Sequence, residues 1–182
     1  MQRLLTLTSS DVLVDAGCGE GFYPGNLQSA SHCHAIGIDI STAAIDLAAR
    51  RYPQCTWLVA NADRRLPLLD ATANWVLSIT ARRTPEEFAR ILQPAGHVLL
   101  ALPAAQDLQE IRGPGLTRID ESLAPFHDTF LEVHRETATH QAELKAGEVE
   151  DLRHAIYRPL QKEAASAQII TFSLDLIILR RR

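Results

Sequence analysis

The chain has 182 residues, of which 46% are hydrophobic and 22% are charged. This length gives room for one globular core and is too short for two full domains, so we expect a single domain over residues 1–182. The net charge of -4 does not indicate a general nucleic-acid surface, and no stretch approaches the roughly 20 apolar residues that cross a bilayer, so we expect no membrane segment.

The N-terminus and the cysteines bear on the compartment and on metal sites. The first ten residues lack the apolar run and the small-residue cleavage site of a secretory signal, so we expect a cytoplasmic protein. Cys18, Cys33 and Cys55 form no CxxC pair and leave an odd thiol. We therefore expect reduced thiols, without a disulfide framework and without a metal site.

From residue 11 onward, short apolar runs alternate with helix-like segments. This alternation predicts a mostly parallel sheet with helices on both of its faces. Ser41 and Thr84 stand where a side chain caps a helix, and Pro85 suits a first helical position. We expect strands at 12–15, 35–39, 56–59, 75–79 and 97–102, and helices at 23–29, 41–51 and 85–92.

The pattern weakens beyond residue 103. We expect a short helix at 106–112, a turn at 113–115, a strand at 130–142, a helix at 147–157 and a strand at 169–179. The two late strands would pair and add an antiparallel edge to the sheet. The expected fold class is therefore α/β, with a mostly parallel seven-stranded sheet, an antiparallel edge and helices on both faces. If the apolar final strand lies at that edge, it offers a contact for a homodimer.

A glycine-rich segment follows the first expected strand directly. Residues 15–21 have the sequence Asp-Ala-Gly-Cys-Gly-Glu-Gly. Glycines let backbone amides approach a ligand that a Cβ would exclude, and the carboxylate of Asp15 can accept hydrogen bonds from ligand hydroxyls or an amine. The spacing differs from the GxGxxG of dinucleotide binders, in which a pyrophosphate meets the helix N-terminus. The segment therefore predicts a ligand that places no phosphate there.

Polar residues also end the second and third expected strands. Asp39 ends the second strand, where a carboxylate can accept both hydroxyls of a ribose. Asn61, Ala62 and Asp63 follow the third strand, where their polar groups can bond the edge of an adenine. Both places have a structural alternative, because Asp39 can cap the following helix alongside Ser41 and turns commonly contain Asn and Asp.

Three stretches of the chain together resemble a known family. They are VLVDAGCGEGFYPGNL, AIGIDISTAAIDLAARRYPQCTWLVANADRRLPLLD and PEEFARILQPAGHVLLALPAAQDLQEIRG, within Val12 to Gly113. These stretches are similar to class I methyltransferases that use S-adenosylmethionine (SAM), and they resemble above all the bacterial 23S rRNA guanine-N1 methyltransferase family. The resemblance implies a Rossmann-like fold, SAM as cofactor and S-adenosylhomocysteine as product.

The resemblance also implies roles for single residues. The glycine-rich segment, with Asp15, Gly17, Gly19 and Gly21, would line the methionine part of SAM. Asp39 and Ile40 would hold the ribose and adenine. Ala62 and Asp63, after the third strand, would lie near the base. Thr80, after the fourth strand, would face the methyl acceptor. The implied cofactor site therefore comprises Asp15, Gly17, Cys18, Gly19, Glu20, Gly21, Asp39, Ile40, Asn61, Ala62, Asp63 and Thr80.

The chain departs from that family mainly on the acceptor side. It reaches its first strand by residue 12, so we expect it to lack the family's N-terminal cysteine-rich zinc module. Residues 80–83 replace the family's Tyr-Ala-Pro turn, residues 93–96 stand at its Lys-Pro-Gly-Gly turn, and residues 155–159 replace a late Met-Thr-Pro segment. We therefore expect a cofactor half over 1–103 and an acceptor-side half over 104–182.

The sequence singles out no catalytic residue. His127, His134, His140 and His154 lie in the acceptor-side half, but no carboxylate partner distinguishes one of them as a base. The pairs 64–65 and 82–83 are arginines that could meet an anionic acceptor or lie in solvent.

We expect a SAM-dependent methyltransferase whose acceptor is a small molecule or a nucleobase of rRNA. The alternative is a non-catalytic SAM-binding module that acts through a protein partner. An NAD-dependent oxidoreductase is disfavoured by the glycine spacing.

Overall fold

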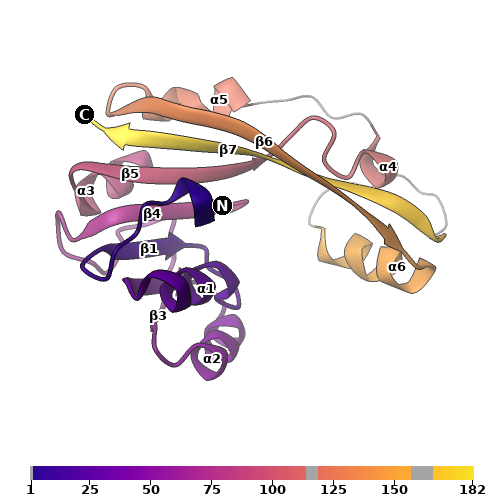
Figure 1. The fold of residues 1–182 in the computed structure, drawn as a ribbon, viewed down its shortest axis with the longest axis horizontal. Coiled ribbons are helices and arrows are strands. Elements are labelled where there is room, and N and C mark those ends of the chain that lie inside the picture. The colour runs from indigo at the N-terminus through magenta and orange to yellow at the C-terminus, as the bar shows by residue number, and fades with distance from the viewer. Residues whose placement is uncertain (1, 114–118, 157–165) are drawn as a thin grey trace.

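The computed structural model of the chain describes residues 2–113, 119–156 and 166–182. Within these residues, seven strands form one sheet in the order β3-β2-β1-β4-β5-β7-β6. The first five strands are parallel, whereas β7 runs antiparallel to both of its neighbours, β5 and β6 (Figure 1). The predicted α/β sheet with an antiparallel edge is therefore confirmed.

The elements alternate as the sequence pattern predicts. The strands are β1 (Val12–Ala16), β2 (His34–Asp39), β3 (Thr56–Val59), β4 (Ala73–Ile79), β5 (Leu92–Pro103), β6 (Phe130–Leu144) and β7 (Gln168–Arg181). The helices are α1 (Phe22–Ser31), α2 (Thr42–Arg51), α3 (Pro85–Ile91), α4 (Gln109–Arg112), α5 (Ile119–Leu123) and α6 (Ala146–Ala155), with 3-10 turns η1 (Gln2–Leu4) and η2 (Ala124–Phe126).

Two hydrophobic cores cover the two faces of the sheet. Phe88 of α3 and Phe126 of η2 pack over one face, against side chains such as Leu100. Leu27 of α1 packs over the other face, together with Leu5 near the N-terminus. Because both faces are covered, β4 and residues 98–102 of β5 are almost wholly buried, which explains the apolar sequence of these segments.

The hairpin of β6 and β7 continues past the carboxyl end of β5, whose last pairing with β7 is at Leu174. We call the part beyond that point the arm: residues 139–144 of β6, residues 168–173 of β7, and the helices α4 and α6 beside them (Figure 1). The arm has its own small core, which comprises Leu108, Ile111, Val149 and Ile170.

Beyond the end of β5, side chains take the place of a neighbouring strand as hydrogen-bond acceptors for the amides of β7. The carboxylate of Glu110 accepts hydrogen bonds from the amide (3.0 Å) and the hydroxyl (2.6 Å) of Thr171. The carboxylate of Asp107 accepts the amide of Ser173 at 2.9 Å. These bonds satisfy strand amides that β5 no longer reaches.

Several details differ from the sequence-based expectation. Residues 93–96 lie inside β5, which begins at Leu92, because an irregularity opposite β4 absorbs the expected turn and puts Ala95 at a φ of +60°. The final strand β7 lies inside the sheet and β6 forms the edge, so the condition for a homodimer contact through the final strand is not met. Residues 114–115 of the expected turn and Tyr157 of the expected helix lie outside the described residues.

The described part of the chain has no helix that is both long and apolar enough to span a membrane. In the same part of the chain, no group of three His, Cys, Asp or Glu side chains is placed to hold a metal ion. All three cysteines are free thiols.

Candidate functional site

A cavity of about 350 Å³ opens at the carboxyl ends of the parallel strands. It lies where the strand order reverses, because β1 pairs with β2 on one side and with β4 on the other. Such switch points are where open α/β sheets bind ligands. The lining residues are Gly17, Asp39, Ile40, Asn61, Ala62, Asp63, Ala81 and Arg82.

The carboxylate of Asp39, at the end of β2, connects the loop after β1 to the loop after β2. One oxygen accepts the amide of Gly19 at 2.9 Å and the other accepts the amide of Ser41 at 2.8 Å. The hydroxyl of Ser41 in turn caps α2 by accepting the amide of Ala44. Asp39 therefore shapes the glycine-rich turn and still has lone pairs for a ligand, because a carboxylate can accept about four hydrogen bonds.

Asp15 is a buried carboxylate at the end of β1. It is 1% exposed, and neither of its oxygens has a hydrogen-bond partner among the described residues. Burial, and secondarily the charge of Asp39, raise the pKa of Asp15 from 3.8 to about 7. A buried polar group without a partner is costly, so it marks a place where a ligand donor or cation would be stabilised.

Two positions of the turn show why glycine is needed there. Gly17 has a φ of +90°, and a Cβ on it would lie 2.5 Å from the Cβ of Ala81. Gly19 has a φ of +53°, and a Cβ on it would meet nothing within 4 Å. The first glycine thus allows β1 to approach the loop after β4, whereas the second leaves open space for a ligand.

The structure does not place every predicted residue in this cavity. Cys18 is buried beneath the turn near Gly37, and Glu20 points to solvent within 3.8 Å of Arg51. Gly21 packs against the ring of Trp57. Six predicted residues line the cavity together: Gly17, Asp39, Ile40, Asn61, Ala62 and Asp63.

Thr80 ends β4 in an unusual conformation. Its φ is +50°, which is rare for a β-branched residue, and its amide donates to the carbonyl of Ala101 at 2.9 Å. Such backbone strain persists only where surrounding contacts impose it, often near functional sites. The next residues, Ala81 and Arg82, form the cavity wall instead of Thr80. Sequence reasoning missed Ala81, because a small apolar side chain carries no chemical signal.

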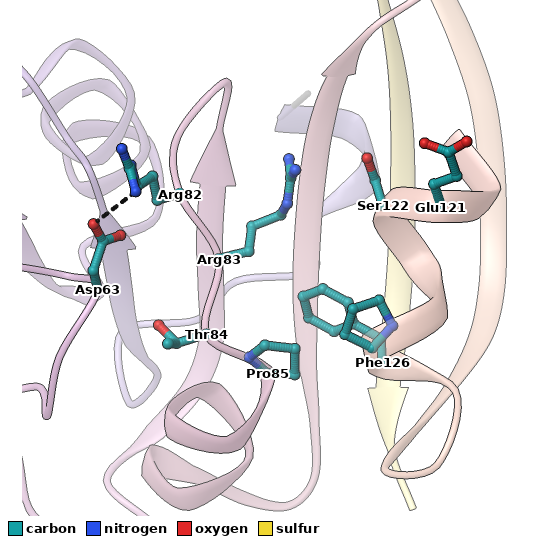
Figure 2. Close-up of a pocket in the computed structure, with 9 residues that line it drawn as sticks. Asp63, Arg82, Arg83, Thr84, Pro85, Glu121, Ser122 and Phe126 are labelled. Carbon is teal, nitrogen blue, oxygen red and sulfur yellow. Dashed lines mark ion pairs between the residues drawn. The ribbon is translucent and has the colours of Figure 1, made fainter. Parts of the chain in front are cut away.

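A second cavity, of about 630 Å³, adjoins the first (Figure 2). It shares Asp63 and Arg82 with the first cavity, and these two side chains form an ion pair at 3.4 Å. Its far wall comes from α5 and η2, which sequence reasoning did not predict. The lining residues are Asp63, Arg82, Arg83, Thr84, Pro85, Glu121, Ser122, Pro125 and Phe126.

The candidate histidines lie elsewhere. His134 is within 3.3 Å of Glu136 on β6, and His154 is within 2.9 Å of the carbonyl of Glu150 on α6. None of the four candidate histidines is among the residues that line the two cavities. These cavities therefore offer none of the four as a base.

Comparison with known proteins gives a consistent result. Residues 13–99 match the model of the methyltransferase domain family. A 23S rRNA (guanine(748)-N(1))-methyltransferase of Streptomyces fradiae is 34% identical over 125 residues, which are 63% of this chain and 45% of that relative. A protein of Micromonospora griseorubida with a provisional 23S rRNA guanine-N(1) methyltransferase name is 36% identical over 60% of this chain and 38% of its own length. The chain thus spans less than half the length of these relatives.

Solved structures share the fold. One is the complex of the Haloferax volcanii Trm112 methyltransferase activator with a provisionally assigned methyltransferase, with a TM-score of 0.68 and 22% identity over 98% of this chain and 86% of that chain. Another is the tRNA (m1A58) methyltransferase TrmI of Aquifex aeolicus, with a TM-score of 0.63 and 12% identity over 100% of this chain and 66% of that chain. At these identities the likeness establishes the Rossmann-like fold alone.

Proposed function

We propose that this chain, in which residues 13–99 form a methyltransferase domain of the SAM-dependent class I fold, transfers a methyl group from SAM to a nucleobase or a small molecule. Residues 1–103 would form the cofactor half and residues 104–182 the acceptor-side half. The named relatives that methylate 23S rRNA support a nucleobase acceptor. The cytoplasmic location expected from the sequence stays a prediction.

One observation carries the proposal: the buried carboxylate of Asp15 lacks a partner beside a glycine turn that Asp39 holds. SAM carries an ammonium and a sulfonium, and positive charge near Asp15 would favour its ionised form and lower its raised pKa. The remaining lone pairs of Asp39 suit ribose hydroxyls. The donor set therefore fits SAM, and Ile40 and Asp63 would contact its adenine.

When bound, SAM supplies a methyl group on a positively charged sulfur. Its displacement needs an acceptor lone pair held in line with the carbon–sulfur bond, so positioning can supply much of the rate. The glycine turn and Asp39 would hold the donor side of that alignment. The residues around the cavity would also exclude water from it.

A protein partner or a second copy of the chain is a further candidate, through the edge strand β6. Leu131 and Val133 on this strand are 42% and 45% exposed, and the strand's outer backbone edge is open. A non-catalytic SAM-binding module would use such a contact for assembly.

Calorimetric titration with SAM, S-adenosylhomocysteine and NAD tests the proposal. We expect the two adenosyl ligands to bind the wild type, NAD to give no heat, and Asp39→Ala to lose binding. Asp46→Ala is the matched control, because Asp46 is an exposed carboxylate on the neighbouring helix α2. Absence of adenosyl binding in a folded wild type would overturn the proposal.

A further inference from the structure

The strand β6 is the outermost strand of the sheet, so among the described residues β7 is its only neighbouring strand (Figure 1). With 15 residues it is longer than the usual strand of about 3–10 residues, and ten of its side chains are exposed. An edge strand presents unpaired N–H and C=O groups along its outer side. The outer side of β6 is therefore a surface to which another strand can be added.

Most of this edge lacks the features by which proteins prevent edge strands from pairing. Such features include proline, lysine and bulges. Residues 134–144 contain no proline, lysine or glycine, and the irregularity in the pairing with β7 lies at the start of the strand. Ala138, Thr139 and His140 are exposed in succession. Because successive side chains point to opposite faces, the described residues cover neither face there. Residues 134–144, which we call the open edge, are accessible to a further strand.

The order of side chains along the open edge is complementary to itself. In an antiparallel pairing of two copies centred on Thr139, each residue before Thr139 lies opposite the residue that follows it by as many positions. Arg135 then faces Glu143 of the second copy, and Glu143 faces its Arg135. Thr137 likewise faces Gln141. Opposite residues lie on the same face of the joined sheet, so each dimer gains two pairs of opposite charge.

Other symmetric registers match the charges less well. Like charges that lie directly opposite each other destabilise a strand pair. A centre at Arg135 or at Glu136 would place two such charges together. A centre at Ala138 replaces both arginine–glutamate pairs with pairs of Glu136 and His140, which carry opposite charges only when the histidine is protonated. The charge order therefore favours the register centred on Thr139.

Arg135 and Glu143 can form these pairs without losing their present contacts. The guanidinium of Arg135 donates to the carboxylate of Glu132 at 2.7 and 2.9 Å and lies 4.0 Å from Asp120. The two bonds to Glu132 use two of its five donors. Glu143 is exposed, and the described residues give its carboxylate no hydrogen-bond or ion-pair partner. Exposed ion pairs contribute little energy, so backbone hydrogen bonds supply the affinity and the charges select the register.

We propose that two copies of this chain associate through the open edge, in the antiparallel register centred on Thr139, so that their two sheets join into one. The twofold axis passes through the Thr139 pair, and both copies use the same surface. The self-complementary charge order is the reason to choose a second copy over an unrelated protein. The proposal is independent of methyl transfer, because no residue of the open edge lines either cavity.

Disulfide cross-linking tests the register. Residues directly opposite in an antiparallel pair have Cα atoms about 4.5 or 5.5 Å apart, within the range of about 4.4–6.8 Å that a disulfide spans. Under mild oxidation by copper phenanthroline, Thr139→Cys should therefore form a covalent dimer on a non-reducing gel. Gln141→Cys alone should not, but an equal mixture of Gln141→Cys and Thr137→Cys should. The wild type is the control for the native thiols, two of which are buried.

Charge exchange tests the contact without new thiols. Arg135→Glu and Glu143→Arg each place like charges opposite each other twice in a dimer, so each should weaken dimerisation about tenfold in sedimentation equilibrium. The double variant Arg135→Glu, Glu143→Arg restores both pairs and should recover most of the wild-type affinity. Arg50→Glu, on the exposed surface of α2, is the control and should leave dimerisation unchanged.

The outcomes separate this inference from the proposed function. A wild type that remains monomeric at every concentration and binds S-adenosylhomocysteine would overturn the dimer and leave the proposed function intact. Equal cross-linking of Thr139→Cys and Gln141→Cys alone would overturn the register, as would dimerisation that neither single charge variant weakens. A dimer with the expected cross-links that binds no adenosyl ligand would instead support the inference and overturn the proposed function.

Discussion

Residues 1–103 and the hairpin of β6 and β7 bury polar side chains in different ways. In the parallel strands β1 and β4 the interior is almost entirely apolar, and Asp15 at the carboxyl end of β1 is buried without a hydrogen-bond partner among the described residues. In β7, by contrast, Thr171, Ser173 and Asp175 are buried along the strand, and the side chain of each is hydrogen-bonded to β6. The hairpin therefore satisfies these side chains within the chain, which the surroundings of Asp15 do not.

A ladder of side-chain hydrogen bonds crosses the hairpin, in the arm and next to it. The hydroxyl of Thr137 donates to Asp175 at 2.5 Å, Thr139 and Ser173 share a bond of 2.8 Å, and the amide of Gln141 donates to Thr171 at 3.2 Å. Cross-strand hydrogen bonds of this kind help to fix the register of β6 against β7. We therefore predict that changes in the arm leave ligand affinity unaltered.

Truncation of one core residue in each region tests whether the two cores are separate. Leu100 and Ile170 are both fully buried, the first in the main core and the second in the arm's core. Leu100→Ala should cost about 2–5 kcal/mol of global unfolding free energy, measured by urea denaturation. Ile170→Ala should instead lower hydrogen-exchange protection in α6 and leave S-adenosylhomocysteine affinity unchanged.

Equal losses of global stability and cofactor affinity in both variants would contradict that separation. Leu131→Ala, at a 42% exposed position on β6, controls for the loss of a leucine without a cavity.

The fold of residues 1–103 follows closely from the sequence, and that of residues 104–182 does so less. The strands β1, β2 and β4 bury apolar side chains, so their short apolar runs mark them, and the hydroxyl of Ser41 caps the start of α2 as expected. The edge strand β6 is mostly exposed, and α5 has only five residues, so neither has a strong periodic signal. Tertiary contacts set these elements.

Asp15 provides the next test. Because its folded pKa is raised from 3.8 to about 7 by burial, the folded protein holds this proton more tightly than the unfolded chain. The contribution of Asp15 to the stability of the unliganded protein should therefore be greatest below about pH 4 and fall by about 4 kcal/mol as the pH rises to about 7, with no further loss from this group above that pH. Asp15→Asn should flatten this part of the profile of unfolding free energy against pH.

Asp175→Asn is the matched control in β7, since Asp175 is buried but accepts a hydrogen bond from Thr137. It should keep the pH slope that Asp15 causes. Persistence of the slope in Asp15→Asn would show that another group produces it.

A smaller effect is expected from a pair of glycines. Gly17→Ala places a Cβ 2.5 Å from Ala81 at a φ of +90°, so it should cost about 1–3 kcal/mol and weaken S-adenosylhomocysteine binding. Gly147→Ala, in α6 of the acceptor-side half, meets nothing within 4 Å and should stabilise by about 0.5–1 kcal/mol. Thermal denaturation with and without ligand measures both, and a neutral Gly17→Ala would mean that the turn can move away from β4.

The sequence indicates the chemistry of the candidate site better than its shape. Asp39 and Asn61 could be placed at strand ends, because parallel strands bring their carboxyl ends to one edge. Their neighbour Ala81 could not be chosen, and the far wall at Glu121 and Phe126 depends on how α5 and η2 pack over the sheet. A residue that contributes only to the shape of a cavity carries no chemical group by which the sequence could identify it.

The smallest expected effect concerns a single hydroxyl that connects the loops lining the two cavities. Thr84 stands at the expected cap of α3, but its hydroxyl donates to the carbonyl of Ala62 at 2.8 Å, joining the loops after β3 and β4. Thr84→Val should cost about 1 kcal/mol of unfolding free energy and weaken S-adenosylhomocysteine binding about twofold to fivefold, because Ala62 lines the cofactor cavity. Thr139→Val removes a bond of equal length in the arm's ladder. If the arm only maintains its own shape, this second change leaves the affinity unaltered; an equal loss in both variants would show that the arm and the cofactor cavity are coupled.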